Sequence, residues 1–589
     1  MESDTIKLFM WGFQQHFQIS LKVRVEELFK ALDPNFEVEV FLLGLVRNES
    51  PTNHPVCLEP EECGFEPHHF ASVREDAKHF LAVASDRNLM ATHPTHQRSI
   101  ERRRERRAEK NAVMKAIEDR HHYANDEFFF SGFMPVADYD VGVVFRLHHK
   151  HGISHYQLPH VYAEDRYQVP ASLTEAVAKL FLQECCASFY VPDPENVADY
   201  DGLKTDEILA RAGDRLMEAP IFAGRGIEGL YGLFKACNFI SSLTYERATS
   251  VGEMLIARQD HPNIQATLTL EKPLSLHQHR AVRKLLEISS VGDAILTNGA
   301  SVTGFGKFFG NYDESKADLL RVRFTGYHKW ELCHADHKLM RVDFGKPALP
   351  LPPLNQQRFT DDLERIFKGI SQSAIKNLFE LSEEACRQRH GTVLVMTPEA
   401  ASESKRLASQ ATGLVPVSLT PKLLKSVTAI DGAVMLDTNG ICHAIGVILD
   451  GEAVEFGNPA RGARYNSSLR YAAQMDARKK DCVVVVVSED GTAEWIPELN
   501  PRISRNILKS KEAEADLILS KTEISYRDAT MLLNWASENR FYLPQSFCEK
   551  ANRIAEARKK LYDEGKINFY FGFGSFEPHP IMSDDYLEE

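Results

Sequence analysis

The sequence lacks an apolar run long enough to cross a membrane. Its longest clean apolar stretch, Val483 to Val487, has the length of a buried strand, whereas a membrane-spanning helix needs about 20 apolar residues. Near the start of the chain, the apolar run from Leu8 to Phe13 is cut short by Gln14 to His16, which argues against a secretory leader. We therefore expect a soluble protein with no membrane partner.

Cysteine is scarce as well. Ten cysteines in 589 residues are too few for a disulfide scaffold. Vicinal cysteines such as Cys185 and Cys186 rarely form a good disulfide, so we interpret the cysteines as reduced thiols. Cys57, Cys63 and the pair His68-His69 do not have a standard zinc-ligand spacing, so no structural zinc is predicted. These features indicate a protein of a reducing compartment, and we expect it to be located in the cytoplasm.

Positive charge is in short supply, because the chain has a formal net charge of −14. An acidic chain gains little from general attraction to nucleic acid or anionic lipid. The exception is the run from Arg102 to Arg107, in a charged segment (98–119) predicted to be a helix with Ser99 as its N-cap. Because glutamates alternate with the arginines, we favour a solvated, ion-paired helix. The alternative is contact with nucleic acid, which charge reversal at Arg103 and Arg106 would abolish.

No region is of low complexity, and the hydrophobic fraction of 43% and charged fraction of 26% are typical of a globular protein. The chain is too long for one core, since domains usually have about 100–200 residues. We predict a multidomain α/β protein, with a stiff proline-rich linker as its clearest boundary. The predicted regions are an α/β domain with a charged helical insertion (1–165), a mainly helical region (166–260), a small β-rich domain (261–346), the linker (347–357), a second α/β domain (358–505) and a helical C-terminal extension with a tail (511–589).

The second α/β domain alternates helices with apolar strands, which is typical of helices packed on a sheet. The segments predicted to be helical are 361–388 and 468–475. The segments predicted to be strands are 391–396, 433–436, 442–449 and 482–487.

Two motifs in this domain carry residues suited to phosphate chemistry. In Asp431-Gly432-Ala433, the aspartate at a strand edge can bind Mg²⁺ or Mn²⁺ as a hard oxygen ligand, and the glycine allows a nucleotide to approach the backbone. In Gly462-Ala463-Arg464-Tyr465-Asn466, the glycine leads into a helix whose first N–H groups can bind phosphate. Arg461, Arg464 and Arg470 can neutralise phosphate charge. These residues alone leave open an ordinary Asp-Gly turn and solvated arginines.

Taken in chain order, four blocks of sequence resemble the diadenylate cyclase family, whose nucleotide-binding domain also occurs in the DNA-integrity scanning protein. The blocks are His390 to Val395, Asp431 to Leu436, Gly462 to Asn466 and Val484 to Glu489. They are similar to the family's glycine-led first strand, its Asp-Gly-Ala block, its Gly-Thr-Arg-His-Arg block and its strand ending in Ser-Glu. Each block alone is modest, whereas four in order are specific.

The resemblance implies a mixed sheet flanked by helices and a nucleotidyltransferase reaction. Two protomers of a homo-oligomer would face each other, each with one ATP and one Mg²⁺ or Mn²⁺ ion, and would condense two ATP into cyclic di-AMP, a bacterial second messenger. The N-terminal half would be an α+β sensor or regulatory region. By position, Asp431 would bind the metal and would act in catalysis with Arg464. The implied nucleotide-binding residues are Gly432, Ala433, Gly462, Ala463, Tyr465, Asn466, Ser488, Glu489 and Arg461.

The third block departs from the family pattern. Tyr465 and Asn466 stand where the family has His and Arg, and Ala463 replaces a threonine. Each lost charge-assisted contact could cost about 1.5–3 kcal/mol of transition-state stabilisation. The alternative function is therefore a catalytically inactive receptor of the same fold that binds an adenine nucleotide and signals to a partner. We favour the enzyme because Asp431 keeps the metal position, which a pure binder would not need.

Overall fold

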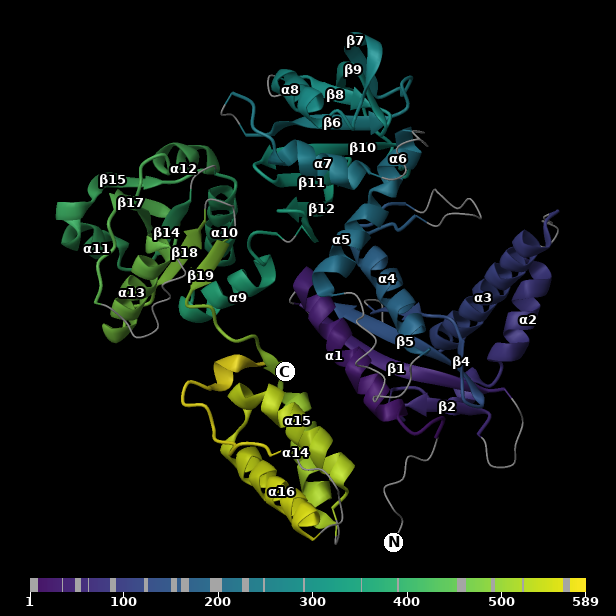
Figure 1. Cartoon of the computed structure of the whole chain (residues 1–589). Coiled ribbons are helices and arrows are strands. Elements are labelled where there is room, and N and C mark those ends of the chain that lie inside the picture. The colour runs from purple at the N-terminus through teal and green to yellow at the C-terminus, as the bar shows by residue number, and fades with distance from the viewer. Residues whose placement is uncertain are drawn as a thin grey trace. The chain divides into compact units, whose positions relative to one another are not determined.

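The structure is a computed structural model. It describes residues 9–33, 35–47, 54–61, 63–84, 92–120, 126–149, 156–159, 169–190, 204–224, 232–246, 249–289, 292–350, 352–388, 391–452, 462–488, 493–521, 524–564 and 572–588. These residues form two compact units, within 5–351 and 352–589, whose helices and sheets are shown in Figure 1. The boundary falls inside the proline-rich segment 347–357. Each unit combines helices with sheets, so the predicted multidomain α/β class is confirmed.

The first unit begins with an antiparallel sheet in the order β2-β1-β5-β3, with β4 paired to β5. Its strands are β1 (Phe36–Val46), β2 (Val56–Glu59), β3 (Asp126–Phe130), β4 (Met134–Val136) and β5 (Tyr139–His149). Helix α1 (Gln14–Leu32) packs on one face, while α2 (Val73–Val83) and α3 (Pro94–Glu118) form a helical pair beside the other. The alternation in β1 explains both contacts, because Val38 and Val40 join the core beneath α1 and Leu43 and Leu45 join the core beneath α3.

Four helices, followed by a second sheet that includes a fifth helix, complete the described part of this unit. The helices are α4 (Leu173–Ser188), α5 (Thr205–Leu216), α6 (Glu218–Gly224) and α7 (Leu233–Ser242). The sheet has the order β13-β12-β11-β10-β6-β8-β9-β7. Its strands are β6 (Val251–Ala257), β7 (Ile264–Ser275), β8 (Ala294–Thr297), β9 (Ser301–Phe308), β10 (Leu319–Gly326), β11 (Lys329–His334), β12 (His337–Asp343) and β13 (Lys346–Ala348), with α8 (His279–Ser289) between β7 and β8. Strands β6 and β8 run parallel, and α6, α7 and α8 contact this sheet.

The second unit contains a mixed sheet in the order β15-β17-β16-β14-β18-β19. Its strands are β14 (Thr392–Met396), β15 (Thr412–Ser418), β16 (Ala433–Leu436), β17 (Ile441–Val447), β18 (Val483–Val487) and β19 (Ala493–Ile496). Its helices are α9 (Gln356–Ile366), α10 (Gln372–Cys386), α11 (Ala400–Arg406), α12 (Pro421–Val427) and α13 (Ala463–Ala477). Side chains of α9, α10 and α12 share one core with the sheet, and those of α11 and α13 share another, so helices cover both faces.

Three helices follow this sheet and form a separate apolar core. They are α14 (Arg505–Ser520), α15 (Tyr526–Glu538) and α16 (Gln545–Asp563). The short strand β20 (Ile503–Ser504) pairs in parallel with β21 (Leu587–Glu588), so the end of the chain returns to the start of these helices. Short 3₁₀ turns occur at Pro67–Phe70, Ala408–Gln410, Arg540–Tyr542 and Asp584–Tyr586.

Several element boundaries differ from the sequence predictions. Helix α3 begins at Pro94 and is capped by His93, whose ring accepts from the Thr95 N–H, so the N-cap predicted at Ser99 is wrong. The single helix predicted over 361–388 is two helices, because the Ser371 hydroxyl caps a new start at α10. Strand β6 lies in the region that was predicted to be mainly helical. The sequence did not indicate this strand because it pairs with β8 and β10, which are distant in the chain.

Two further observations concern the chain as a whole. All ten cysteines are free, as interpreted from their spacing. Within the described ranges, no helix combines the length and the apolar character needed to span a membrane.

Candidate nucleotide-binding site

The mixed sheet of the second unit brings the predicted motif blocks to one edge. Strands β14 and β16 run parallel with Val393 opposite Ala433, so the residues before these two strands lie side by side. Strands β14 and β18 run antiparallel with Thr392 opposite Val487, so Ser488, which follows β18, lies at the same edge. The Asp-Gly block, the start of the first strand and Ser488 at the end of β18 therefore meet here.

Gly432 is required at this edge by both conformation and space. Its φ of +114° is a left-handed conformation that side chains rarely adopt. A Cβ on Gly432 would also lie 2.6 Å from the carbonyl carbon of Gly446, which belongs to β17. The close approach of these two backbones sets where β16 begins, and it holds Asp431 at the rim of the sheet.

Helix α13 provides the second half of the site. Its N-cap is Gly462, which has no side chain to occupy the helix start, and an added Cβ there would meet no atom within 4 Å. The Arg464 guanidinium lies 3.2 Å from the Asp431 carboxylate (Nη2 to Oδ1). The ion pair is solvent-accessible, because the two side chains are 39% and 87% exposed. The helix start and the Asp-Gly block are thus adjacent and open to a ligand.

The other predicted nucleotide-binding residues have different environments. Ala433 is buried in the core between the sheet and α13, so only its backbone could border a ligand. Tyr465 is partly buried and packs against the same core, and the Asn466 amide donates to the Gly462 carbonyl one turn earlier (3.3 Å). Ala463 and Ser488 are exposed. Two predicted residues, Arg461 and Glu489, lie outside the described residues.

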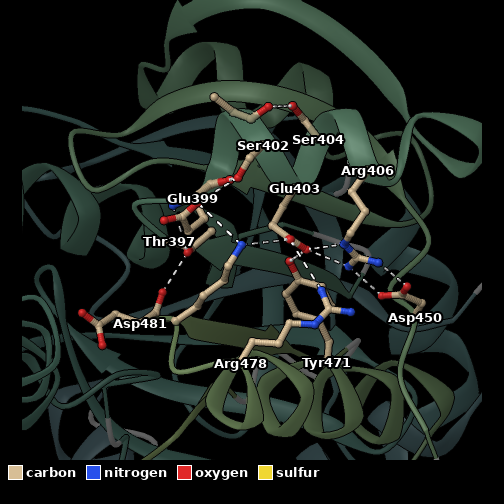
Figure 2. Close-up of polar contacts among 12 residues, drawn as sticks. Thr397, Glu399, Ser402, Glu403, Ser404, Arg406, Asp450, Tyr471, Arg478 and Asp481 are labelled. Carbon is tan, nitrogen blue, oxygen red and sulfur yellow. Dashed lines mark hydrogen bonds and ion pairs between the residues drawn. The ribbon is translucent and has the colours of Figure 1, made fainter.

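A buried polar network anchors the opposite end of α13, and Figure 2 shows it around Glu403 of α11. Glu403 is 2% exposed. Its carboxylate accepts from the Arg406 guanidinium at 2.6 and 2.8 Å and from the Tyr471 hydroxyl of α13 at 3.1 Å. Arg406 also bonds the Asp450 carboxylate (2.9 Å, Nη2 to Oδ1), and Arg478 lies 3.7 Å from Glu403. The network ties α11, α13 and the segment after β17 together.

The network keeps its acidic groups ionised. Burial would raise the pKa of the Glu403 carboxyl, but its bonds to Arg406 and Tyr471 hold that pKa below the ordinary value. The Arg406 guanidinium likewise lowers the pKa of Asp450. Burial raises the pKa of Tyr471, so its hydroxyl stays protonated and can donate to Glu403. A close approach adds to this anchoring, since a Cβ on Gly451 would lie 2.8 Å from the backbone of Arg470 in α13.

Sequence reasoning did not identify this network. Glu403 and Arg406 have the spacing of an ordinary i, i+3 helix pair, and nothing local marks them as buried. Their partners Tyr471 and Asp450 are distant in the sequence. The sequence did carry a signal for a different feature, the close approach of Gly446 to Gly432, because a glycine inside a predicted strand often marks such an approach.

The described part of the chain has no group of three or more His, Cys, Asp or Glu side chains arranged to hold a metal ion. Of the residues at the sheet edge, the Asp431 carboxylate has the chemistry for a hard cation. A single carboxylate fits Mg²⁺, which is commonly held by one or two carboxylates together with substrate phosphates.

A sheet covered by helices on both faces, with a glycine-bearing strand start beside a helix N-terminus, has the construction of a nucleotide-binding α/β domain. The comparison with protein families identifies the class. Residues 380–496 match the family described as the DisA bacterial checkpoint controller nucleotide-binding domain. These residues are therefore a domain of the diadenylate cyclase family, as the four sequence blocks predicted.

Two more family matches cover most of the first unit. Residues 10–217 match a family described as probable sensor domain DACNG, and residues 231–336 match one described as probable sensor domain DACNH. The chain thus combines N-terminal domains of sensor type with a diadenylate-cyclase-type nucleotide-binding domain. A search of curated proteins found no match to this chain.

Proposed function

We propose that the sheet edge at Asp431 and Arg464 binds ATP and that two such sites condense two ATP molecules into cyclic di-AMP. The supporting observation is the 3.2 Å contact between these two side chains, beside Gly432 and the start of α13. Residues separated by more than thirty positions meet where backbone N–H groups, a guanidinium and a carboxylate can all face one ligand. Such a set is suited to a triphosphate with its cation.

Each residue has a role that follows from its chemistry. Arg464 would exchange its exposed partner Asp431 for a phosphate group, because guanidinium binds phosphate with two parallel hydrogen bonds. Asp431 would then be available to hold Mg²⁺ or Mn²⁺ together with the phosphates. When bound, the cation neutralises phosphate charge. Gly432 would border the nucleotide through its backbone.

The reaction is phosphoryl transfer by positioning and electrostatic stabilisation. The 3′-oxygen of each ATP attacks the α-phosphate of the other, two P–O bonds to pyrophosphate break, and the products are cyclic di-AMP and two pyrophosphates. One chain offers one such site, so the proposal requires two copies with facing nucleotide-binding domains. Control by the N-terminal domains of sensor type would make the product a signal.

A second candidate is a receptor that binds an adenine nucleotide without turnover. It is favoured by Tyr465, which packs against the core, and by Asn466, which bonds its own helix at Gly462. These side chains occupy the positions where the family has His and Arg, and neither supplies a positive charge to a phosphate.

The test is incubation of the full chain with ATP and Mg²⁺ or Mn²⁺, followed by chromatographic separation of the nucleotides. We expect cyclic di-AMP from the wild type and a loss of about 100-fold or more in Asp431→Asn, the usual cost of removing a preorganised electrostatic group. Asp476→Asn is the matched control, because Asp476 is exposed near the far end of α13. Saturable ATP binding without product would support the receptor. Absence of ATP binding in the wild type would refute both candidates.

A further inference from the structure

Helix α3 of the first unit is longer than its packing requires. It has 25 residues, which corresponds to about 37 Å. Five of its six buried residues lie at Ala108 or beyond, and Ile100 is the buried residue of the first half. The first half therefore has little apolar contact to hold it, and it belongs to the α2–α3 pair that stands beside the first sheet in Figure 1. A helix segment of this kind is polar on nearly every side.

This half of α3 concentrates positive charge. Residues 98–107 contain six arginines and two glutamates, in a chain whose net charge is −14. Arg98, Arg102 and Arg106 are all exposed. Because they are four residues apart, they follow one row along the helix at intervals of about 6 Å. We call these three residues the arginine row.

The helix itself neutralises the arginine row only at one end, where Glu109 attracts Arg106 electrostatically. Over the described chain, no member of the row makes an ion pair or a hydrogen bond. Glu101 instead accepts from Gln97 (2.8 Å), and Glu105 borders a cavity of about 290 Å³ between α2 and α3. The ion-paired helix favoured from the sequence is therefore wrong for these three arginines.

We propose that the arginine row binds the phosphate backbone of a double-stranded nucleic acid. The row spans about 12 Å from Arg98 to Arg106, and one strand of a duplex presents a phosphate about every 3.4 Å along its axis. Several phosphates therefore lie within the length of the row, and each guanidinium can bind a phosphate bidentately. A local basic row is also the form that nucleic-acid contact must take in an acidic chain.

The residues around the row argue against an anionic lipid surface as the partner. An interfacial helix needs a broad apolar face that inserts between lipids. Here Ser99 and Arg103 lie beside the row, and Arg103 donates to the Ser99 carbonyl (3.3 Å). Nucleic acid would then be the class of ligand for the domain at 10–217, whose family is described as a probable sensor. The inference does not depend on the function proposed for the nucleotide-binding site.

The test is fluorescence anisotropy of a labelled 20-base-pair DNA duplex with the full chain at 50, 100 and 200 mM NaCl. Wild type should bind with affinity that falls steeply with salt. In the triple variant Arg98→Ala, Arg102→Ala, Arg106→Ala, we expect at least about 30-fold weaker binding at 100 mM NaCl. The slope of log affinity against log salt should fall by about 2.7, since each phosphate contact contributes about 0.9.

Two variants make the result specific. Replacing the same arginines by lysine keeps the charge and should preserve most of the binding. The lysine variant also provides a test if the alanine variant folds poorly. Replacing Lys422, Lys425 and Lys509 by alanine removes three exposed charges from the second unit and should leave binding unchanged.

Three outcomes would overturn the proposal. In the first, the wild type does not bind the duplex at 50 mM NaCl. In the second, the arginine-to-alanine variant binds within threefold of wild type. In the third, alanine at Lys422, Lys425 and Lys509 weakens binding as much as alanine at the three arginines. A parallel assay uses vesicles of phosphatidylcholine with phosphatidylserine. Vesicle binding that depends on the arginine row, with duplex binding that does not, would assign the row to a lipid surface instead.

Discussion

Replacing Arg406 by alanine tests whether the buried network positions α13. The substitution removes two hydrogen bonds to Glu403, at 2.6 and 2.8 Å, and the contacts to Asp450. It leaves a carboxylate that is 2% exposed without its closest cation. Breaking a buried pair in this way costs about 3–5 kcal/mol.

Two features of the network reduce that cost. The Arg406 side chain is itself 30% exposed, and Arg478 and Lys480 remain 3.7 Å from the Glu403 carboxylate. We therefore expect Arg406→Ala to lower the free energy of unfolding by about 3 kcal/mol, the lower end of this range. For a domain of this size, 1 kcal/mol lowers Tm by about 2–4 °C, so Arg406→Ala should lower it by about 6–12 °C.

The assay is differential scanning calorimetry of the full chain, with hydrogen exchange to assign the transition to α11 and α13. Arg387→Ala is the control, because Arg387 makes ion pairs on an exposed part of α10 and such pairs contribute about 0–1 kcal/mol. Since α13 also carries Arg464, ATP binding should weaken in Arg406→Ala although Arg406 does not lie at the sheet edge.

A double variant can refute the reasoning. If an uncompensated buried charge causes the loss, adding Glu403→Gln to Arg406→Ala should recover about 1 kcal/mol or more, because glutamine is neutral and can still accept from Tyr471. A double variant that is less stable than Arg406→Ala would show that the carboxylate is not the source of the cost.

Two other predictions concern the same domain. Gly432→Ala should abolish ATP binding measured by isothermal titration calorimetry, because the new Cβ would lie 2.6 Å from Gly446, whereas Gly413→Ala, which meets nothing within 4 Å, should not. The pKa of Glu403 is lowered in the fold. The contribution of the ionised Glu403 carboxylate to the free energy of unfolding should therefore be complete above about pH 4.5 and should be lost as the pH falls further. The stability difference between wild type and Glu403→Gln should shrink on acidification, and a difference that grows would contradict the pairing.

Local sequence patterns were sufficient for the apolar strands and the motifs. Strand β16 has the predicted bounds, because a wholly apolar run reports burial directly. Strand β15 was not predicted, because it is an exposed edge strand that contains Pro416 and depends on pairing with β17. Strand β19 was also missed, since its four residues are strand-like only beside β18.

Four ordered blocks of sequence were enough to predict a diadenylate-cyclase-type domain, because the order of motifs does not depend on packing. Which side chains meet, in contrast, follows from the fold. The contact of Asp431 with Arg464 depends on the register of parallel strands and on where α13 crosses the sheet. Glu403 pairs with its neighbour Arg406 and also with Tyr471, which is distant in the sequence. In α3, likewise, the composition indicated ion pairing. In the described structure, however, Arg98 and Arg102 lie at positions on the helix surface where they have no ion-pair partner. Periodicity records which residues are buried, but contacts between distant residues follow from how the elements pack.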